Sequence, residues 1–266
     1  MKSKRWLVYV YLVLTAVLTI GLMAFGGCGG GGGVDYEDGG HYLPITHDTL
    51  IQYNGTEVLE YAAYVRTKDN DGGSTNEYYG ETDYVSLGWQ NLNRDNLMKI
   101  MTVSEHSYPS HFWNTESRYF YHDINDNIYL YSYETSGSFY PANPVDNDTG
   151  IRYMPHRITI GSSWGGAHGF LYGGDYYVGN INFTVLGKEE IGVPFGAVET
   201  FKIAISGEYE SQVDGSTYKI TAYGTIWIHP DIGVIREYKT QEINRPGWFY
   251  TVRRERQLTT INWALN

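Results

Sequence analysis

The residues Gly161 to Gly165 match the pattern G-x-S-x-G, which in hydrolases presents a nucleophilic serine on a sharp turn between a strand and a helix. Ser163 would be the nucleophile, and His229 follows it in an order that a catalytic triad permits. The residues after Ser163 are rich in glycine and give no helix N-terminus that could stabilise an oxyanion. We therefore expect a strand-end turn here, and a serine hydrolase ranks third among the functions considered.

A second chemistry to consider is calcium binding by acidic loops. Asp123 and Glu134 occupy the first and twelfth positions of an EF-hand spacing, but the sixth position is Ile128, where the sharp turn needs glycine. We expect a hairpin turn after Asp123, with calcium as the alternative. Two further acidic loops carry the same alternative, at 69–71 and 146–148.

The eight histidines show no pairing typical of a metal site. His106 and His111 are expected in a loop, solvated or hydrogen-bonded. We expect no resident metal, no cofactor and no catalytic residue, and therefore a protein that is not an enzyme.

The N-terminus has the order of a bacterial lipoprotein leader. Lys2, Lys4 and Arg5 are cationic, residues 6–25 carry no charge, and Gly26-Gly27 precedes Cys28, the single cysteine. This order predicts a signal helix over 1–27, cleavage, and lipid attachment at Cys28. The alternative is an uncleaved transmembrane helix, since about 20 apolar residues span a bilayer. Residues 28–41 then form a glycine-rich tether.

This leader predicts a membrane-anchored lipoprotein of the bacterial cell envelope. A diacylglyceryl group on Cys28 would hold the chain on a membrane, each buried methylene contributing about 0.8 kcal/mol. By analogy with enteric lipoproteins, Gly29 directly after Cys28 favours the outer membrane over the inner one.

The composition and net charge of the chain limit the classes of molecule that it can bind. Removing residues 1–27 takes away three cationic and no acidic residues, so the net charge falls from −11 to −14. Such a charge argues against nucleic acid as a partner. With one cysteine no intrachain disulfide forms, so packing and sheet hydrogen bonds must hold the fold together.

Residues 42–266 are predicted to form one antiparallel all-β domain, because short apolar or alternating runs are separated by turn signals. The 26 tyrosines suit paired strands better than helices. A long loop is expected near 136–153. The predicted strands are 50–53, 58–65, 78–87, 97–103, 118–122, 128–133, 181–186, 199–209, 218–228, 234–243 and 249–258, with a hairpin turn at Asn54-Gly55.

Several blocks together resemble TapB-like and related uncharacterised bacterial lipoproteins. The blocks are 42–53, 160–164, 192–201 and 225–236. The chain departs from the family pattern at His229, where a small residue is usual, and lacks the tryptophan expected within 50–53. The resemblance implies a curved antiparallel sheet or open half-barrel akin to LolA and LppX, whose concave face takes acyl chains, and it carries over no catalytic residue.

The same blocks also have a structural interpretation. Pro194 and Gly196 would set a turn before a long strand, while Pro230 and Gly233 would turn the chain into the next one. Trp164 belongs to the same structural set, and Trp227 is expected to anchor the core.

The leading hypothesis is a non-enzymatic envelope lipoprotein that shelters a lipid or other apolar molecule in the concavity of its sheet. The alternative is a surface module that binds polysaccharide or an envelope protein partner.

Overall fold

The computed structural model describes residues 56–91, 93–106, 112–125, 127–135, 138–145, 148–172, 175–213, 215–230 and 232–261. The strands are β1 (Thr56–Asp69), β2 (Ser74–Asn91), β3 (Arg94–His106), β4 (Phe112–His122), β5 (Ile128–Thr135), β6 (Ser138–Pro141), β7 (Ile151–Met154), β8 (Ser163–Tyr172), β9 (Asp175–Val193), β10 (Gly196–Val213), β11 (Ser216–His229), β12 (Gly233–Arg245) and β13 (Trp248–Ile261). The described residues include no helix able to cross a membrane.

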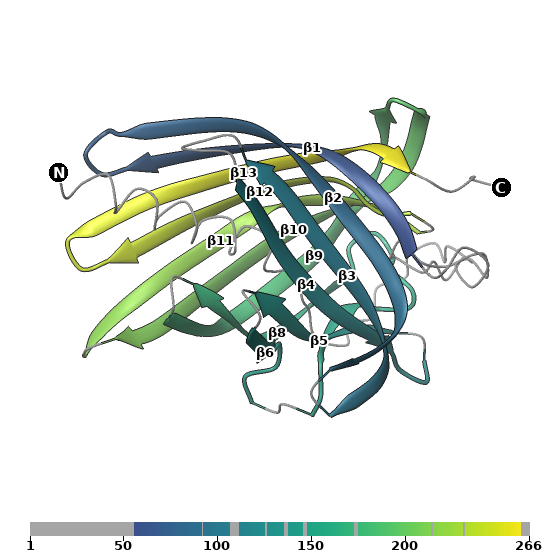
Figure 1. Cartoon of the computed structure of the whole chain (residues 1–266), viewed down its shortest axis with the longest axis horizontal. Coiled ribbons are helices and arrows are strands. Elements are labelled where there is room, and N and C mark those ends of the chain that lie inside the picture. The colour runs from purple at the N-terminus through teal and green to yellow at the C-terminus, as the bar shows by residue number, and fades with distance from the viewer. Residues whose placement is uncertain are drawn as a thin grey trace.

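All 13 strands belong to one antiparallel sheet, which confirms the predicted all-β class. The order is β6-β5-β4-β3-β2-β1-β13-β12-β11-β10-β9-β8, with β7 paired to β5. The first and last strands that the structure describes, β1 and β13, are therefore neighbours in the middle of the sheet, as the blue and yellow hairpins of Figure 1 show.

The sheet curls into a nearly closed barrel (Figure 1). Its two ends meet where the Gly169 amide of β8 donates to the carbonyl of Ala142, just after β6, at 3.3 Å. The Tyr133 hydroxyl of β5 donates to the Gly169 carbonyl at 3.3 Å. Farther along, the Trp164 indole of β8 donates to the carbonyl of Tyr153 in β7. The barrel thus closes further than the half-barrel that the resemblance implies.

Alternation along each strand separates an inner from an outer face, as the two-residue side-chain period requires. In β9, for example, Ile181, Phe183 and Val185 are buried, while Leu186 is exposed. Around β8–β11 the buried side chains are mostly aliphatic or aromatic. Between β12 and β4 many of them are charged.

Three strands lie where the sequence predicts turns or a loop. β8 falls on a glycine-rich segment for which turns are expected, and β6 with β7 occupies part of the predicted loop at 136–153. The first predicted strand (50–53), the turn at Asn54-Gly55 and the signal helix lie outside the described residues.

Candidate functional site

The barrel interior holds a cluster of buried charges, here called the interior charge network. Its centre is Arg254 of β13, which is 1% exposed and donates from Nη2 to both carboxylate oxygens of Glu81 on β2. Strand β1 lies between β13 and β2, and the Arg254 side chain crosses β1 to reach Glu81. On this part of β1, Ala63 has the smallest inward side chain. The other charged members are Asp83, Arg118, Glu237, Lys239 and Arg256.

Short contacts connect the members of this network, which come from the four strands β2, β4, β12 and β13. Arg256 Nε donates to Glu237 Oε2 at 2.9 Å, and its Nη1 lies 3.3 Å from Asp83 Oδ2. Lys239 Nζ lies 2.6 Å from Glu237 Oε1. Arg118 Nη2 on β4 lies 3.8 Å from Asp83 Oδ2. The network therefore ties β2 and β4 to β12 and β13.

The network favours the ionised carboxylates of Glu81 and Glu237. Burial alone would raise the pKa of Glu81, but the guanidinium groups of Arg254 and Arg256 outweigh burial and hold that pKa below its usual range. For Glu237, Lys239 and Arg256 likewise overcome burial and lower the pKa. Ions held this way fix the strands relative to one another, and they occupy space that an acyl chain would need.

Two histidines lie inside the barrel as well. His106 ends β3, fully buried, with Nδ1 3.1 Å from Glu77 of β2; the sequence prediction of a loop histidine is wrong for it. Burial lowers the pKa of His106 despite the opposing effect of Glu77. His168 of β8 is fully buried, with Nδ1 3.3 Å from the Tyr209 hydroxyl, and burial together with Lys239 lowers its pKa to about 3. His111 lies outside the described residues.

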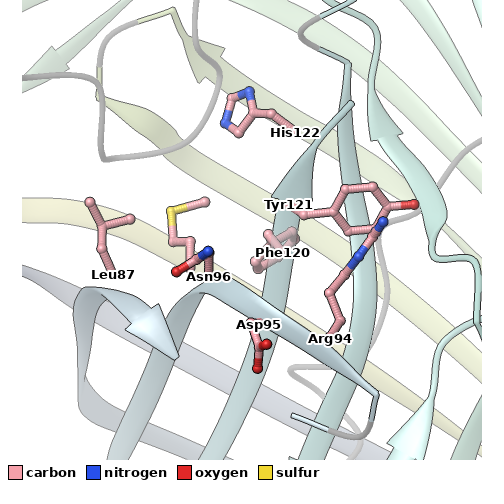
Figure 2. A pocket seen from close by; sticks show the side chains of 8 residues that line it. Leu87, Arg94, Asp95, Asn96, Phe120, Tyr121 and His122 are labelled. Carbon is pink, nitrogen blue, oxygen red and sulfur yellow. The ribbon is translucent and has the colours of Figure 1, made fainter. Parts of the chain in front are cut away.

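A pocket of about 380 Å³ opens where the end of β2, the start of β3 and the end of β4 meet. We call it the end pocket (Figure 2). Its apolar wall is Leu87, Met98 and Phe120, of which Met98 and Phe120 belong to the buried core. The remaining lining residues are Arg94, Asp95, Asn96, Tyr121 and His122.

Arg94 gives the end pocket its cationic side. Its guanidinium carbon lies 3.5 Å from the centre of the Tyr121 ring, as the stacked groups in Figure 2 show. Within the described part of the chain, Arg94 Nη1 is buried without a hydrogen-bond partner. Asn96 has φ of 55°, a left-handed conformation that asparagine tolerates better than most residues. An apolar wall beside an unsatisfied cationic donor suits a molecule with one apolar and one anionic end.

The outer face of β2 to β6 carries an aromatic patch next to this pocket. Trp89 is 42% exposed and Phe139 48% exposed, while Tyr121 stacks on Tyr129 with 5.1 Å between ring centres. Lys99 Nζ lies 4.3 Å from the Trp89 ring centre.

The serine motif is placed on a turn and a strand. Gly161 has φ of 86° in the turn before β8, and Ser163 is an exposed residue at the first position of that strand. Since β8 follows directly, the strand-to-helix turn of a hydrolase is not formed. Trp164, the next residue, points inward, is 4% exposed and stacks on Phe183.

Trp227 is buried, but on the outer wall of β11 rather than in the barrel interior. Its indole lies between its cross-strand neighbours Lys202 and Arg236, with both cations 5.3 Å from the ring centre. The indole N–H donates to Glu189 Oε2 at 3.0 Å.

The four turn residues lie between strands. Pro194 is in the two-residue connection from β9 to β10, and Gly196 starts β10 with φ of 138°. Pro230 follows β11, and Gly233 starts β12 with φ of 92°. Positive φ at Gly196 and Gly233 explains why glycine occupies both places.

The acidic loop after β4 is closed by its own aspartate. Asp123 Oδ1 accepts the amides of Asn125 and Asn127, and these bonds help to lower the pKa of Asp123 against the effect of burial. Asp69 accepts the amides of Asp71 and Gly73 in the same way. Residues 146 and 147 and Cys28 lie outside the described residues.

Sequence reasoning missed the interior charge network and the end pocket. A signal was present, because Glu81 and Asp83 have the same parity as the buried Val85, and Arg254 and Arg256 the same parity as Val252 and Leu258. Charges in phase with core residues indicate buried ion pairs.

Comparison with known proteins gives only distant likenesses: no family model and no curated protein matches the chain. Similar solved structures include a "putative lipoprotein" from Parabacteroides distasonis, with 14% identity over 85% of this chain and 100% of that one and a TM-score of 0.42. Another is a "putative exported protein with YmcC-like fold" from Bacteroides fragilis, with 12% identity, 84% and 100% coverage and a TM-score of 0.35. The third is the "hypothetical lipoprotein YmcC" from Escherichia coli, with 12% identity, 77% and 86% coverage and a TM-score of 0.28.

At these identities and TM-scores the likenesses establish neither family membership nor function. None of the three is described as TapB-like or as a LolA or LppX protein. The resemblance noted in the sequence therefore stays a prediction.

Proposed function

We propose that this protein is a non-enzymatic lipoprotein of the bacterial cell envelope, anchored through Cys28, whose barrel binds an amphiphilic molecule at the end pocket. The leader supports the anchor. The observation that carries the binding role is the composition of the end pocket, where Leu87, Met98 and Phe120 face the same space as Arg94.

The position of the charges decides which part of the barrel a ligand occupies. An acyl chain running through the middle of the barrel would have to displace Arg254, Arg256 and their partners, and breaking buried ion pairs costs about 3 to 5 kcal/mol. At the end pocket the apolar portion of a ligand meets Met98 and Phe120, and an anionic head pairs with the guanidinium group of Arg94.

Binding is tested with a fluorescent fatty acid. Leu87 is 48% exposed and lines the pocket, so Leu87→Asp places a carboxylate at the apolar wall with little effect on the core. We expect Leu87→Asp to weaken probe binding at least tenfold. The matched control is Leu186→Asp, since Leu186 is 52% exposed on β9, away from the pocket. Equal binding of the fluorescent fatty acid by the two variants would exclude the end pocket as the binding site.

Anchoring is tested separately. Cys28→Ser removes the single thiol that can carry a diacylglyceryl group, so the variant should be released from the membrane fraction or stay unprocessed. A variant of mature size that still sediments with membranes would contradict lipidation at Cys28.

The aromatic patch favours one other function, binding of a saccharide on the outer wall. Trp89 and Phe139 present exposed rings of the kind that stack on sugar faces. Trp89→Ala would then reduce retention on immobilised envelope polysaccharide without changing fatty acid binding.

A further inference from the structure

A basic pocket of about 280 Å³ lies on the outer wall of the barrel, where β1 pairs with β13. It is lined by Arg66 and Lys68 of β1 and by Thr251 and Arg253 of β13. The sheet register places Arg66 opposite Arg253 and Lys68 opposite Thr251. Three cations therefore share one face of two adjacent strands, in a chain whose net charge is −11.

Every described lysine outside this pocket has an acidic partner. Lys99, Lys188, Lys202, Lys219 and Lys239 all form ion pairs. Within the part of the chain that the structure describes, no ion pair involves Arg66, Lys68 or Arg253.

The neighbouring strands do not neutralise this charge directly. On the β2 side, Arg66 is opposite Asn76 and Lys68 is opposite Ser74. On the β12 side, Thr251 is opposite Glu242, whose carboxylate already accepts the Tyr223 hydroxyl at 3.0 Å. Glu255 on β13 and Glu60 on β1 also lie on this face, two residues beyond Arg253 and six residues before Arg66.

This arrangement is unfavourable without a ligand. Like charges directly opposite each other in an antiparallel pair of strands destabilise the sheet. Arginine forks donate paired hydrogen bonds to phosphate oxygens, and a lysine and a hydroxyl can satisfy a further oxygen. In a phosphate monoester and in the phosphodiester of a phospholipid headgroup alike, the non-bridging oxygens share the negative charge, and each can accept hydrogen bonds from a guanidinium or ammonium group.

We propose that Arg66, Lys68, Thr251 and Arg253 form a binding site for the phosphate group of a phosphate ester, separate from the end pocket. The open, 280 Å³ pocket leaves room for the ester substituent beside the phosphate. Two sources share this chemistry, a soluble phosphate ester and the headgroup of an anionic phospholipid.

The test uses the full chain in neutral detergent micelles and follows its thermal unfolding midpoint, because a ligand that binds the folded state raises that midpoint. One arm adds inorganic phosphate or glycerol 3-phosphate against chloride at equal ionic strength. The other arm adds phosphatidylglycerol or phosphatidylcholine to the micelles. The variants are Arg66→Gln/Arg253→Gln and Lys68→Gln, and Lys188→Gln/Lys219→Gln removes two paired cations elsewhere as the control.

We expect the wild type and the control to be stabilised, and the apparent affinity of the double arginine variant to fall at least tenfold. Stabilisation by soluble phosphates identifies a soluble ester as the source, and stabilisation by phosphatidylglycerol alone identifies the lipid headgroup. In chloride the arginine variant should unfold at or above the wild-type midpoint, since a repulsion is removed. The proposal is overturned if neither arm stabilises the wild type, if the arginine variant responds equally, or if its midpoint in chloride is lower.

Discussion

A buried histidine makes the stability of this barrel sensitive to acid. Burial, assisted by Lys239, lowers the pKa of His168 from 6.5 to about 3. In the unfolded chain this imidazole takes up a proton below pH 6.5, while in the folded chain it stays neutral, so the free energy of unfolding falls as the pH drops from 6.5 toward 3.

His168→Phe should remove this contribution. Because one pKa unit corresponds to about 1.4 kcal/mol, the loss of stability between pH 7 and pH 5 should shrink by about 2 kcal/mol. Urea denaturation at pH 7, 6 and 5 measures the free energy of unfolding of the wild type and of His168→Phe. Tyr209→Phe is the control, since it removes the hydroxyl near Nδ1 but keeps the titrating group. Equal pH slopes in wild type and His168→Phe would contradict the account.

Trp227 contributes to stability from the outer wall. It is 8% exposed, so Trp227→Ala should lower the free energy of unfolding by about 3 kcal/mol, the low end for a buried tryptophan. Trp89→Ala, at an exposed tryptophan, should change it by less than about 1 kcal/mol. Chemical denaturation followed by circular dichroism measures the unfolding midpoints of the two variants. Equal midpoints would show that Trp227 does not contribute to the packing of the fold.

At the scale of strands, the interior charge network joins the first strands of the chain to the last. Arg254→Met leaves the buried carboxylate of Glu81 without its main partner and should cost about 3 to 5 kcal/mol. The double variant Arg254→Met/Glu81→Met should recover much of this loss, since neither charge is then left unpaired. Urea denaturation measures the free energy of unfolding of both variants. A double variant no more stable than Arg254→Met would show that Arg254 and Glu81 do not act as a pair.

Glycines fix how closely some strands approach. A Cβ on Gly224 of β11 would collide with the Tyr238 carbonyl and with Lys239 Cα of β12, so Gly224→Ala should destabilise the sheet by more than about 1 kcal/mol. A Cβ on Gly187 of β9 would meet open space, and the φ of Gly187 is not positive. Gly187→Ala should therefore be neutral or stabilising. Similar unfolding midpoints for the two variants would argue against this close approach.

The strands that the sequence predicts best are those with apolar alternation, such as β10 with Phe201, Ile203 and Ile205. β8 escapes prediction because Gly165 and Gly169 look like turn residues. In the structure a Cβ on Gly165 would collide with Ile181 and Asn182, and one on Gly169 would collide with Tyr176. Here glycine reflects contact with the neighbouring strand, and that contact depends on pairing that no local pattern encodes.

At the scale of the whole molecule, barrel closure, the interior charge network and the basic pocket depend on residues far apart in the chain. Glu81 and Arg254 are 173 positions apart, as are Asp83 and Arg256. Local periodicity gives the faces of single strands, but the meeting of β1 with β13 follows only from the complete strand order. The sequence therefore predicts the fold class well and the candidate site poorly.

The central claim is that an amphiphile binds at the end pocket and not along the barrel axis. Native mass spectrometry of the full-length protein, purified from its own cells in a neutral detergent, tests this most directly. We predict that the wild type and Leu186→Asp each carry the mass of one amphiphile more than Leu87→Asp does. The same additional mass on all three proteins, or none on the wild type, would contradict the claim.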